Sequence, residues 1–248
     1  MKDTSNYQLY DAFGDRYDLH TPAHHYKHDH QFLIQRIQEV GGLGKVLDIG
    51  CGTGVFIEKA LDAGLDPIGL DPAPAMLHLA SQKVGRERVC LGRMQDLDAQ
   101  REFDAITALS WSLNYCRDYD ELCSVLRRCK KALNSNGGLF LQVAHAPHAA
   151  KQPDNFFVDY ENGPGGPKDI VMKYRFWATD HQTMMAEYNF ECISTADSFR
   201  ETHVLNIANA MLVVRAAEEA GFIDLEILGN FEGGPVDKSI SLFVIGRA

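Results

Sequence analysis

The chain has 248 residues, of which 45% are hydrophobic and 23% are charged, and its formal net charge at pH 7 is -10. A chain of this length and composition can bury one large core, so we expect a single α/β domain with an insertion. The negative charge argues against a nucleic-acid partner, since that binding relies on cationic side chains that neutralise phosphates.

The cysteines and the N-terminal residues indicate the cellular location of the protein. Six cysteines show neither a Cys-x-x-Cys pair nor zinc-type spacing, and we interpret them as reduced core residues. The first residues lead into no apolar run, and no stretch reaches the length needed to cross a bilayer. The sequence therefore predicts a cytoplasmic protein without a membrane partner, and we allow for a homodimer.

Residues 1–44 are rich in aromatic residues and histidine, and they end in a glycine break. The apolar spacing at 32–37 predicts a helix, so we expect 1–44 to form a helical N-terminal lid. Its histidines, among them His24 and His28 at helical spacing, could line the substrate entrance. No carboxylate or cysteine stands near them at a spacing typical of a metal site, so no metal site is predicted.

An apolar strand at 46–49 runs straight into a turn with three alternating glycines, Gly50, Gly52 and Gly54. Because glycine has no side chain, the backbone of such a turn can come very close to a ligand. The spacing differs from the Gly-x-Gly-x-x-Gly of dinucleotide folds and from a phosphate-binding P-loop, and no lysine or arginine follows before Lys59. The turn therefore predicts a small ligand that is not held through phosphate.

From 45 to 150, short apolar runs alternate with amphipathic helices such as 119–133, which predicts a parallel sheet covered by helices on both faces. Residues 151–169 are predicted to form a loop, marked by glycines and prolines at 163–167. Strand-like runs at 170–178, 184–193 and 198–205 have short links, so we predict that 151–205 form an inserted antiparallel platform. A helix at 208–220 and strands at 222–228 and 240–246 complete the core over 206–248.

The strand and turn at 46–54 resemble the first motif of class I S-adenosylmethionine (SAM)-dependent methyltransferases. Ordered landmarks continue the resemblance, namely Ile68-Gly69-Leu70-Asp71, Met94-Gln95-Asp96-Leu97, 103–109 and 137–141. The resemblance implies a doubly wound, mostly parallel seven-stranded sheet, Rossmann-like, whose last strand inserts antiparallel beside the fifth. It also implies SAM as the cofactor.

The resemblance implies a role for several residues at the strand ends. Asp71 would accept hydrogen bonds from the ribose hydroxyls, Asp96 would meet the adenine amine, and Tyr17 or Tyr10 would reach the methionyl carboxylate. The expected cofactor contacts are Tyr17, Asp48, Gly50, Cys51, Gly52, Gly54, Asp71, Pro72, Met76, Gln95, Asp96, Leu97 and Leu109.

The sulfonium of SAM already activates the methyl group, so the protein must mainly align an acceptor and exclude water. His145, directly after the fifth strand, could take a proton from an amine or hydroxyl, or it could make a structural hydrogen bond at the strand end. Tyr17 is the second predicted catalytic residue. The predicted substrate contacts, of which those on the platform could equally face solvent, are Tyr10, Tyr26, Trp111, Asn114, Tyr174, Arg175, Asn189, Arg200 and His203.

The layout resembles small-molecule amino-sugar and glycine N-methyltransferases. Residues 110–115 depart from the Asn/Asp-Pro-Pro-Tyr signature of methyltransferases that act on nucleic acids and protein glutamine, which argues against macromolecular targets. The expected function is methyl transfer from SAM to a small metabolite, with N-methylation of an amine preferred over O-methylation of a carboxylate or hydroxyl. Two alternatives stay open: intramolecular cyclisation of SAM, and a SAM-binding sensor without turnover.

Overall fold

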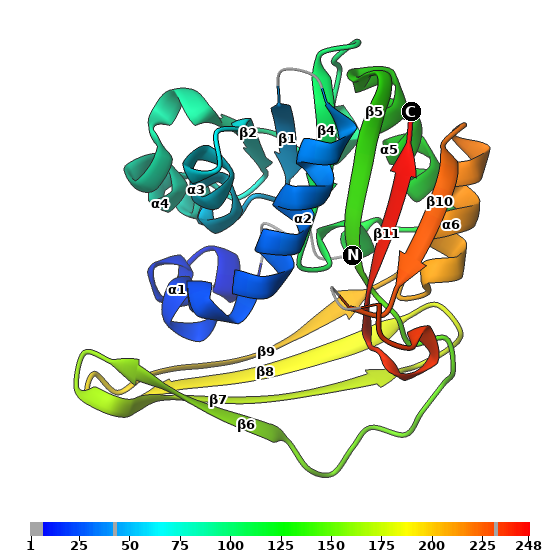
Figure 1. Ribbon diagram of the computed structural model, residues 1–248. Helices are drawn as coiled ribbons and strands as arrows, with labels where there is room; N and C mark the ends of the chain where they lie inside the picture. The colour runs from blue at the N-terminus through cyan, green and yellow to red at the C-terminus, as the bar shows by residue number, and fades with distance from the viewer. Residues whose placement is uncertain (1–6, 42–43, 231–232) are drawn as a thin grey trace.

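The computed structural model of the protein describes residues 7–41, 44–230 and 233–248. A seven-stranded sheet flanked by helices forms the upper part of Figure 1, and a separate four-stranded sheet lies beneath it. The N-terminal segment, with the short helix α1 (Tyr17–His20), lies between these two parts. Within the described residues, no helix combines the length and the apolar character needed to cross a bilayer.

The seven-stranded sheet has the strand order β10-β11-β5-β4-β1-β2-β3. Strand β11 runs antiparallel to both of its neighbours and the other neighbouring pairs are parallel, so the predicted sheet with an antiparallel last strand beside the fifth is confirmed. The strands are β1 (Lys45–Ile49), β2 (Asp66–Asp71), β3 (Val89–Leu91), β4 (Phe103–Ala108), β5 (Leu133–Ala144), β10 (Ile223–Leu228) and β11 (Ser241–Arg247).

Helices cover both faces of this sheet, as near-continuous apolar strands require. Helices α5 (Tyr119–Ala132) and α6 (Ala210–Glu219) pack on one face. Helices α2 (Lys27–Val40) and α3 (Val55–Asp62) pack on the other, and α4 (Pro74–Val84) flanks α3. Short 3-10 turns complete the chain: η2 (Gln8–Tyr10), η3 (Gly14–Arg16), η4 (Ala23–Tyr26), η5 (Arg86–Arg88), η6 (Met94–Asp96), η7 (Ser112–Tyr115) and η8 (Val236–Lys238).

Helix α5 shows why the helix predictions succeed. The Asp118 carboxylate accepts a hydrogen bond from the Glu121 amide at 2.9 Å, which caps the first turn. Leu122, Val125 and Leu126 recur at helical spacing and are fully buried against the sheet. The helix predicted for 119–133 is therefore confirmed to within one residue.

All six cysteines are free. Five are buried, whereas Cys90 on β3 is exposed, so the prediction of core thiols is wrong for Cys90. Strand β3 is an edge strand of the sheet, and Cys90 and Leu91 on it are both exposed.

The inserted platform has four strands instead of the three that the sequence predicts. They are β6 (Phe157–Gly163), β7 (Gly166–Ala178), β8 (Met184–Cys192) and β9 (Asp197–Leu205), antiparallel in that order. The loop predicted for 151–169 is therefore wrong over β6, because the glycines and prolines at 163–167 form the hairpin turn between two strands. Phe157, Val158 and Tyr160 on this edge strand are exposed, so it lacks the apolar alternation of a buried strand.

The platform has two faces of different character. The inner face packs Met172, Phe190 and Phe199 against Leu9 and Phe13 of the N-terminal segment. The outer face carries Glu187, whose side chain is 3% exposed although it is charged. Arg175 Nη2 lies 2.7 Å from one Glu187 oxygen and Arg200 Nη2 lies 2.6 Å from the other, so this carboxylate is neutralised in place.

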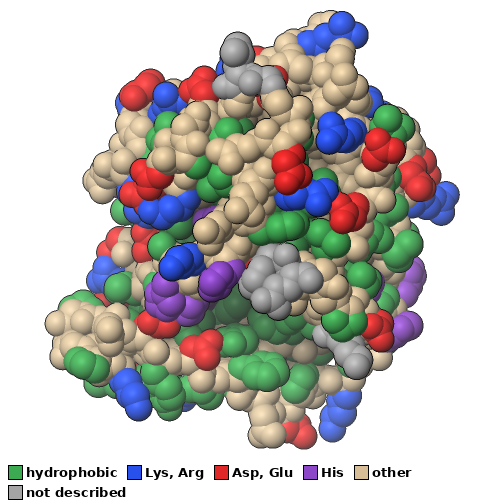
Figure 2. Space-filling model, viewed as in Figure 1, with side chains coloured by type: hydrophobic (Ala, Val, Ile, Leu, Met, Phe, Trp, Pro, Cys, Tyr) green, Lys and Arg blue, Asp and Glu red, His purple; other side chains and the backbone are tan. Residues whose placement is uncertain are grey.

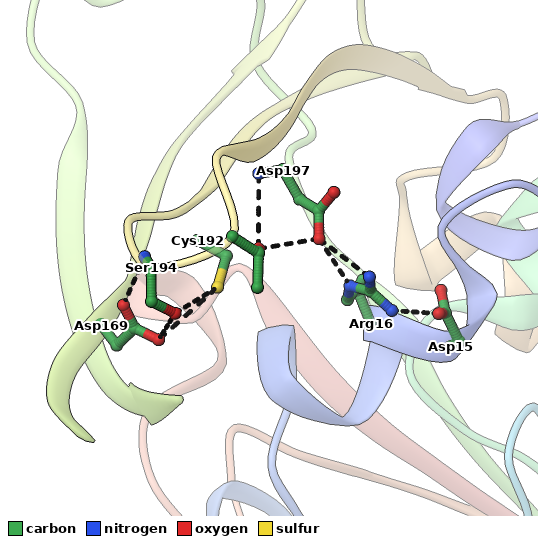
Figure 3. A network of polar contacts seen from close by, with 7 residues as sticks. Asp15, Arg16, Asp169, Cys192, Ser194 and Asp197 are labelled. Carbon is green, nitrogen blue, oxygen red and sulfur yellow. Dashed lines mark hydrogen bonds and ion pairs between the residues drawn. The ribbon is translucent and has the colours of Figure 1, made fainter. Parts of the chain in front are cut away.

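Residues 7–26, which we call the cover segment, are fixed to both parts of the molecule. Arg16 Nη2 lies 2.8 Å from Asp197 at the tip of the platform. Figure 3 shows Arg16 between Asp15 and Asp197, close to the hairpin where Asp169 accepts hydrogen bonds from the amide and hydroxyl of Ser194. On the core side, Asp18 accepts a 2.6 Å hydrogen bond from Thr53 and pairs with Lys83.

The platform leaves the core and returns to it at one place. The Ala146 amide, just after β5, donates a 2.8 Å hydrogen bond to the Ala208 carbonyl, just before α6. The Asn206 amide also bonds to the Asn114 carbonyl at 2.9 Å, so the returning chain is held against the end of η7.

Candidate active site

The glycine turn between β1 and α3 adopts a backbone that requires glycine. Gly50, Gly52 and Gly54 have φ angles of +71°, +53° and +80°, in the left-handed region. A Cβ at Gly50 would lie 2.3 Å from the Ser112 hydroxyl, whereas a Cβ at Gly52 would meet no atom within 4 Å. The turn is thus closed against the protein at Gly50 and open at Gly52, where a ligand can approach the backbone.

Two buried aspartates stand beside this turn. Asp71, at the end of β2, accepts hydrogen bonds from the Gly52 amide at 2.9 Å and the Ala73 amide at 2.8 Å. Burial raises its pKa to about 6, although these two amides act in the opposite direction. Asp48 at the end of β1 accepts a 2.7 Å hydrogen bond from Thr107, and burial raises its pKa to about 7.

A cavity lies over the glycine turn. Its floor is formed by the turn and both aspartates, and its cover by Tyr10, Tyr17 and Tyr26 of the cover segment. The described residues that line it include no lysine or arginine. Two carboxylates without a cationic partner favour a positively charged ligand and disfavour a phosphorylated one.

A second cavity adjoins the first, and the two share Gly50, Pro72, Met94 and Tyr115. Gln95 lines its wall after β3, and Thr202 and Val204 of the platform close its other side. Figure 2 shows a recess with hydrophobic walls between the core and the platform, with histidines at its rim.

Most of the cofactor contacts expected from the sequence gather around these cavities. Gln95 lines the second one. Gly54 packs against Ala80, Asp96 is exposed, and Leu97 packs on the core, so the structure does not bring these three to the first cavity. The residues that line the first cavity are Tyr17, Asp48, Gly50, Cys51, Gly52, Asp71, Pro72, Met76 and Leu109.

The expected substrate contacts divide between the two faces of the platform. Tyr10 and Tyr26 line the first cavity. Trp111, Tyr174 and His203 lie among the aromatic side chains between the platform and the core. Three others, Arg175, Asn189 and Arg200, lie on the outer face, where the two arginines bind Glu187 and are directed away from both cavities.

Asn114 and His145 hold the backbone in place. The Asn114 carboxamide accepts from the Ala144 amide at 3.0 Å and donates to the Ile207 carbonyl at 2.5 Å. His145 Nδ1 accepts a 3.2 Å hydrogen bond from the Ala210 amide at the start of α6, and its side chain lines neither cavity. The sequence left two roles open for His145, a proton acceptor or a structural hydrogen bond at the strand end. The structure shows the structural hydrogen bond.

Several lining residues were not predicted from the sequence. His30, stacked on Tyr26 with ring centroids 5.4 Å apart, reaches the cavity from α2. Thr53, Ser110 and Ser112 line it through loops at the ends of β1 and β4. The position of these loops at the carboxyl ends of parallel strands is the signal that could have identified them.

The fold supplies a carboxylate to the histidines of the cover segment. His24 and His25 lie beside Glu161 of β6, and their ligand atoms fall within 4.8 Å of one another. His25 Nε2 is 2.9 Å and His24 Nε2 is 3.4 Å from the same Glu161 oxygen. The sequence could not predict this cluster, because Glu161 is separated from His25 by 136 positions.

His20 gives a prediction on acid stability. Within the described part of the chain neither of its buried ring nitrogens has a hydrogen-bond partner, and burial lowers its pKa to about 3. In the unfolded chain His20 is protonated as pH falls through about 6.5, whereas in the folded chain it stays neutral. The contribution of His20 to the free energy of unfolding is therefore fully present above pH 6.5 and is lost as pH falls. Between pH 7.5 and 5 this costs the wild type about 2 kcal/mol, which His20→Phe should regain.

Urea denaturation at both pH values measures this difference. The exposed His181 provides the control, since His181→Gln should leave the pH dependence unchanged. Equal losses in wild type and His20→Phe would show that His20 is not held neutral.

The comparisons with known proteins agree with this site. A family model described as a methyltransferase domain matches residues 46–137. Two relatives named as methyltransferases, from Geobacillus and Bacillus subtilis, are 27% identical over 60% and 64% of this chain, which spans 62% and 66% of their length. A glycine/sarcosine N-methyltransferase of Halorhodospira halochloris is 28% identical over 82% of this chain and 87% of its own length.

Solved structures show the same fold. The DesVI protein of Streptomyces venezuelae superposes with a TM-score of 0.74 at 18% identity, over 94% of this chain and 96% of its own. A SAM-bound amino pentose methyltransferase from Micromonospora echinaspora gives a TM-score of 0.68 at 20% identity, over 89% and 90% of the two chains. Residues 46–137 thus match a methyltransferase domain, and the chain shares the fold of these solved structures.

Proposed function

We propose that the protein transfers the methyl group of SAM to a small metabolite, and that the accepting atom is an amine nitrogen. The observation that carries the proposal is the cavity over the glycine turn, which holds two buried carboxylates and, among its described lining residues, no lysine or arginine. SAM bears a sulfonium group, an ammonium group and one carboxylate, so its net positive charge suits this cavity, whereas NAD would bring a pyrophosphate to it.

The residues of the cavity fit SAM in shape as well as in charge. The open side of Gly52 lets the amino-acid part of the cofactor approach the backbone. Asp71 uses one lone pair of each oxygen for backbone amides, so both oxygens keep a lone pair for the ribose hydroxyls. Asp48 is placed to attract the ammonium group, and Gln95 with Pro72 would frame the adenine in the second cavity.

The chain's own residues provide alignment and a dry site. SAM supplies a methyl group that is already activated by the positive sulfur. Tyr10, Tyr17 and Tyr26 cover the cavity from the platform side and exclude water, which limits the acceptor to molecules that fit beneath them. Because the described lining residues of the first cavity offer no cation to hold a carboxylate acceptor, we favour an amine over a carboxylate.

Relatives support the same preference without deciding it. Besides the glycine/sarcosine enzyme, a dTDP-4-amino-2,3,4,6-tetradeoxy-D-glucose N,N-dimethyltransferase of Saccharopolyspora spinosa is 31% identical over 43% of this chain and 42% of its own. The alternative is O-methylation, since a ubiquinone biosynthesis O-methyltransferase of Azorhizobium caulinodans is 31% identical over 46% of this chain. Free cysteines suit a reducing compartment, so the proposal includes the cytoplasm as location.

A two-step experiment tests the proposal. S-adenosylhomocysteine (SAH) should raise the melting temperature of the protein, and NAD should not. Methyl-labelled SAM is then incubated with primary and secondary amines, hydroxyl compounds and carboxylates, and the products are identified by mass spectrometry. A labelled amine supports the proposal, a labelled oxygen supports O-methylation, methylthioadenosine supports cyclisation, and SAH binding without any product supports a sensor.

The raised pKa values of the two aspartates predict how binding depends on pH. Ionised Asp48 and Asp71 bind the cofactor, and their pKa values of about 7 and about 6 mean that the free protein takes up protons as pH falls through this range. Below pH 6 the dissociation constant for SAH should therefore rise about tenfold or more for each pH unit. Calorimetry between pH 8 and 5 measures the rise.

Asp48→Asn separates the two groups. In this variant the loss of affinity should begin near pH 6 instead of pH 7, because only Asp71 still titrates. A dissociation constant that is flat from pH 8 to 5 in the wild type would contradict the assignment of both aspartates.

A further inference from the structure

A continuous chain of hydrogen bonds runs from the first cavity into the interior of the platform. Tyr10 Oη lies 3.0 Å from Tyr115 Oη, and Tyr115 Oη lies 2.6 Å from Nδ1 of His203. His203 Nε2 then lies 3.0 Å from Glu201 Oε1. The four side chains come from η2, η7 and β9, so only the folded chain brings them together.

The inner end of this chain is buried and firmly held. His203 is 1% exposed and Glu201 is 8% exposed. The ring of Tyr7 stacks on His203 with centroids 3.9 Å apart, and the Gln8 amide donates a 2.6 Å hydrogen bond to the second oxygen of Glu201. The outer end is different, since Tyr10 and Tyr115 both line the cavity that contains Asp71 and the glycine turn.

One arrangement of protons satisfies every member when Glu201 is ionised. Its carboxylate accepts from Nε2–H of His203, which leaves Nδ1 as an acceptor for the Tyr115 hydroxyl. The oxygen of Tyr115 then accepts from the hydroxyl of Tyr10, a residue that lines the cavity. The chain therefore ends at the cavity in a hydrogen-bond acceptor.

The charge of the buried pair favours uptake of a proton. Among the described residues, no lysine or arginine pairs with the Glu201 carboxylate, which lies buried beside the imidazole. A proton that reaches His203 converts the pair into imidazolium and carboxylate, whose attraction is strong where water is excluded. Burial holds the pKa of Tyr10 and of Tyr115 well above the ordinary value, so neither hydroxyl can keep the negative charge, and the proton passes through both in one movement.

We propose that Glu201, His203, Tyr115 and Tyr10 form a proton relay that takes the proton released by the methyl acceptor. The inference rests on the methyl transfer proposed above. As the acceptor nitrogen or oxygen bonds to the methyl carbon, the carbon–sulfur bond of SAM breaks and its electron pair stays on the sulfur of SAH. The acceptor's proton passes to Tyr10, the Tyr10 proton to Tyr115, and the Tyr115 proton to Nδ1 of His203.

The hydroxyls of Tyr10 and Tyr115 are the members that meet the cavity, and His203 and Glu201 act through them as positioning residues. After the products leave, the same chain in reverse returns the proton to water in the open cavity. Each turnover therefore yields a methylated acceptor, SAH and one released proton.

The other groups around His203 do not compete for this proton. Tyr188 of β8 meets the imidazole edge-on at 5.3 Å, and Tyr10 does so at 5.5 Å. His20 of the cover segment interacts electrostatically with His203. Burial lowers the pKa of His20 to about 3, so it adds no positive charge at neutral pH. Glu201 is thus the anion that faces His203 directly.

The same hydrogen bonds would arise if these four side chains only fastened the cover segment to the platform. Kinetic measurements separate this structural role from the relay. The variants are His203→Gln, Tyr115→Phe and Glu201→Gln, with Ser198→Ala on the outer face of β9 as the matched control. His203→Gln, Glu201→Gln and Ser198→Ala, at residues outside the lining of both cavities, should bind SAH within about twofold of the wild type. With an acceptor found in the labelled-SAM screen, kcat at pH 7 should fall about 100-fold or more in the three relay variants, the size expected for loss of a general base, and not in Ser198→Ala.

The pH profile is the readout that a fastening role would not move. In His203→Gln the deficit in kcat should shrink as pH rises and the acceptor loses its proton unaided, while the KM for SAM stays unchanged. Variants that retain kcat and the wild-type profile, with only a lower melting temperature, would overturn the relay. Loss of SAH binding by the wild type would instead defeat the proposed function.

A measurement without an acceptor covers the case in which the screen returns none. In the SAH complex of protein labelled with 15N-histidine, the ring signals of His203 are followed by NMR from pH 5.5 to 9. The relay requires His203 to gain a proton in this range, and to do so at a lower pH in Glu201→Gln than in the wild type. A single protonation state throughout would overturn the proposal, since His203 could then not hold the proton.

Discussion

Asp71→Ala should weaken SAH binding more than tenfold, with little loss of stability. The Asp71 carboxylate lies at the end of β2, and it is buried at 6% exposure among the residues that line the first cavity. It would accept charge-assisted hydrogen bonds from two ribose hydroxyls, and their joint loss corresponds to roughly 1.5–3 kcal/mol of binding free energy. Because its pKa is raised to about 6, the buried anion is not a source of folding stability, so the variant should fold.

Isothermal titration calorimetry with SAH measures the effect. Asp62→Ala, at an exposed aspartate at the end of α3, is the matched control and should bind as the wild type does. Asp71→Asn should fall between the two, because the amide keeps one acceptor oxygen. An Asp71→Ala protein with wild-type affinity would mean that the ribose lies elsewhere.

Glu187→Ala should lower the free energy of unfolding by about 3 kcal/mol, the cost of breaking a buried ion pair by removal of one partner. The Arg175 side chain is only 13% exposed, so it would lose its anion without gaining water. Burial by itself raises the pKa of Glu187, but hydrogen bonds from Arg175 and Arg200 outweigh it and hold the pKa below its ordinary value. The carboxylate is therefore an anion that the folded platform requires.

Urea denaturation followed by circular dichroism measures this loss. Glu191→Ala, at an exposed glutamate on the same face of β8, is the control and should change stability by no more than about 0.5 kcal/mol. If Glu187→Ala unfolds within 1 kcal/mol of the wild type, the outer ion cluster is not needed for stability.

The core could be predicted because local chemistry and position coincide there. A run of apolar residues that ends in Gly50, Gly52 and Gly54 needs a strand and a left-handed turn, and both are observed. Asp71 follows the next strand, and parallel strands place their carboxyl ends at one edge. Most of the expected cofactor contacts therefore meet around one cavity.

The platform was harder to predict because its signals are not local. Strand β6 lies at the edge with most of its side chains exposed, so it lacks the alternation that marks β7 to β9. Alternation correctly separates Arg175 from Tyr174, but it cannot say which face covers the site. Whether a face is inner or outer depends on contacts with Leu9 and Phe13, distant segments of the chain.

The relay could not have been predicted from the sequence. His203 was expected to contact substrate because of its strand alone, and Tyr115 was not singled out. They lie 88 positions apart, and the 2.6 Å hydrogen bond between them exists only because β9 returns beside η7. For His145 the sequence left two roles open, and the structure shows the hydrogen bond to the Ala210 amide that one of them requires.

The hydrogen bond between Ala146 and Ala208 has an evolutionary consequence. The two ends of the insertion meet at this hydrogen bond. The entropic cost of closing the inserted loop grows only slowly with its length, so a longer or different insertion should leave the seven-stranded sheet intact. If the proposed function holds, the platform could therefore be exchanged for one that accepts another substrate, while the part of the core proposed to bind SAM stays unchanged.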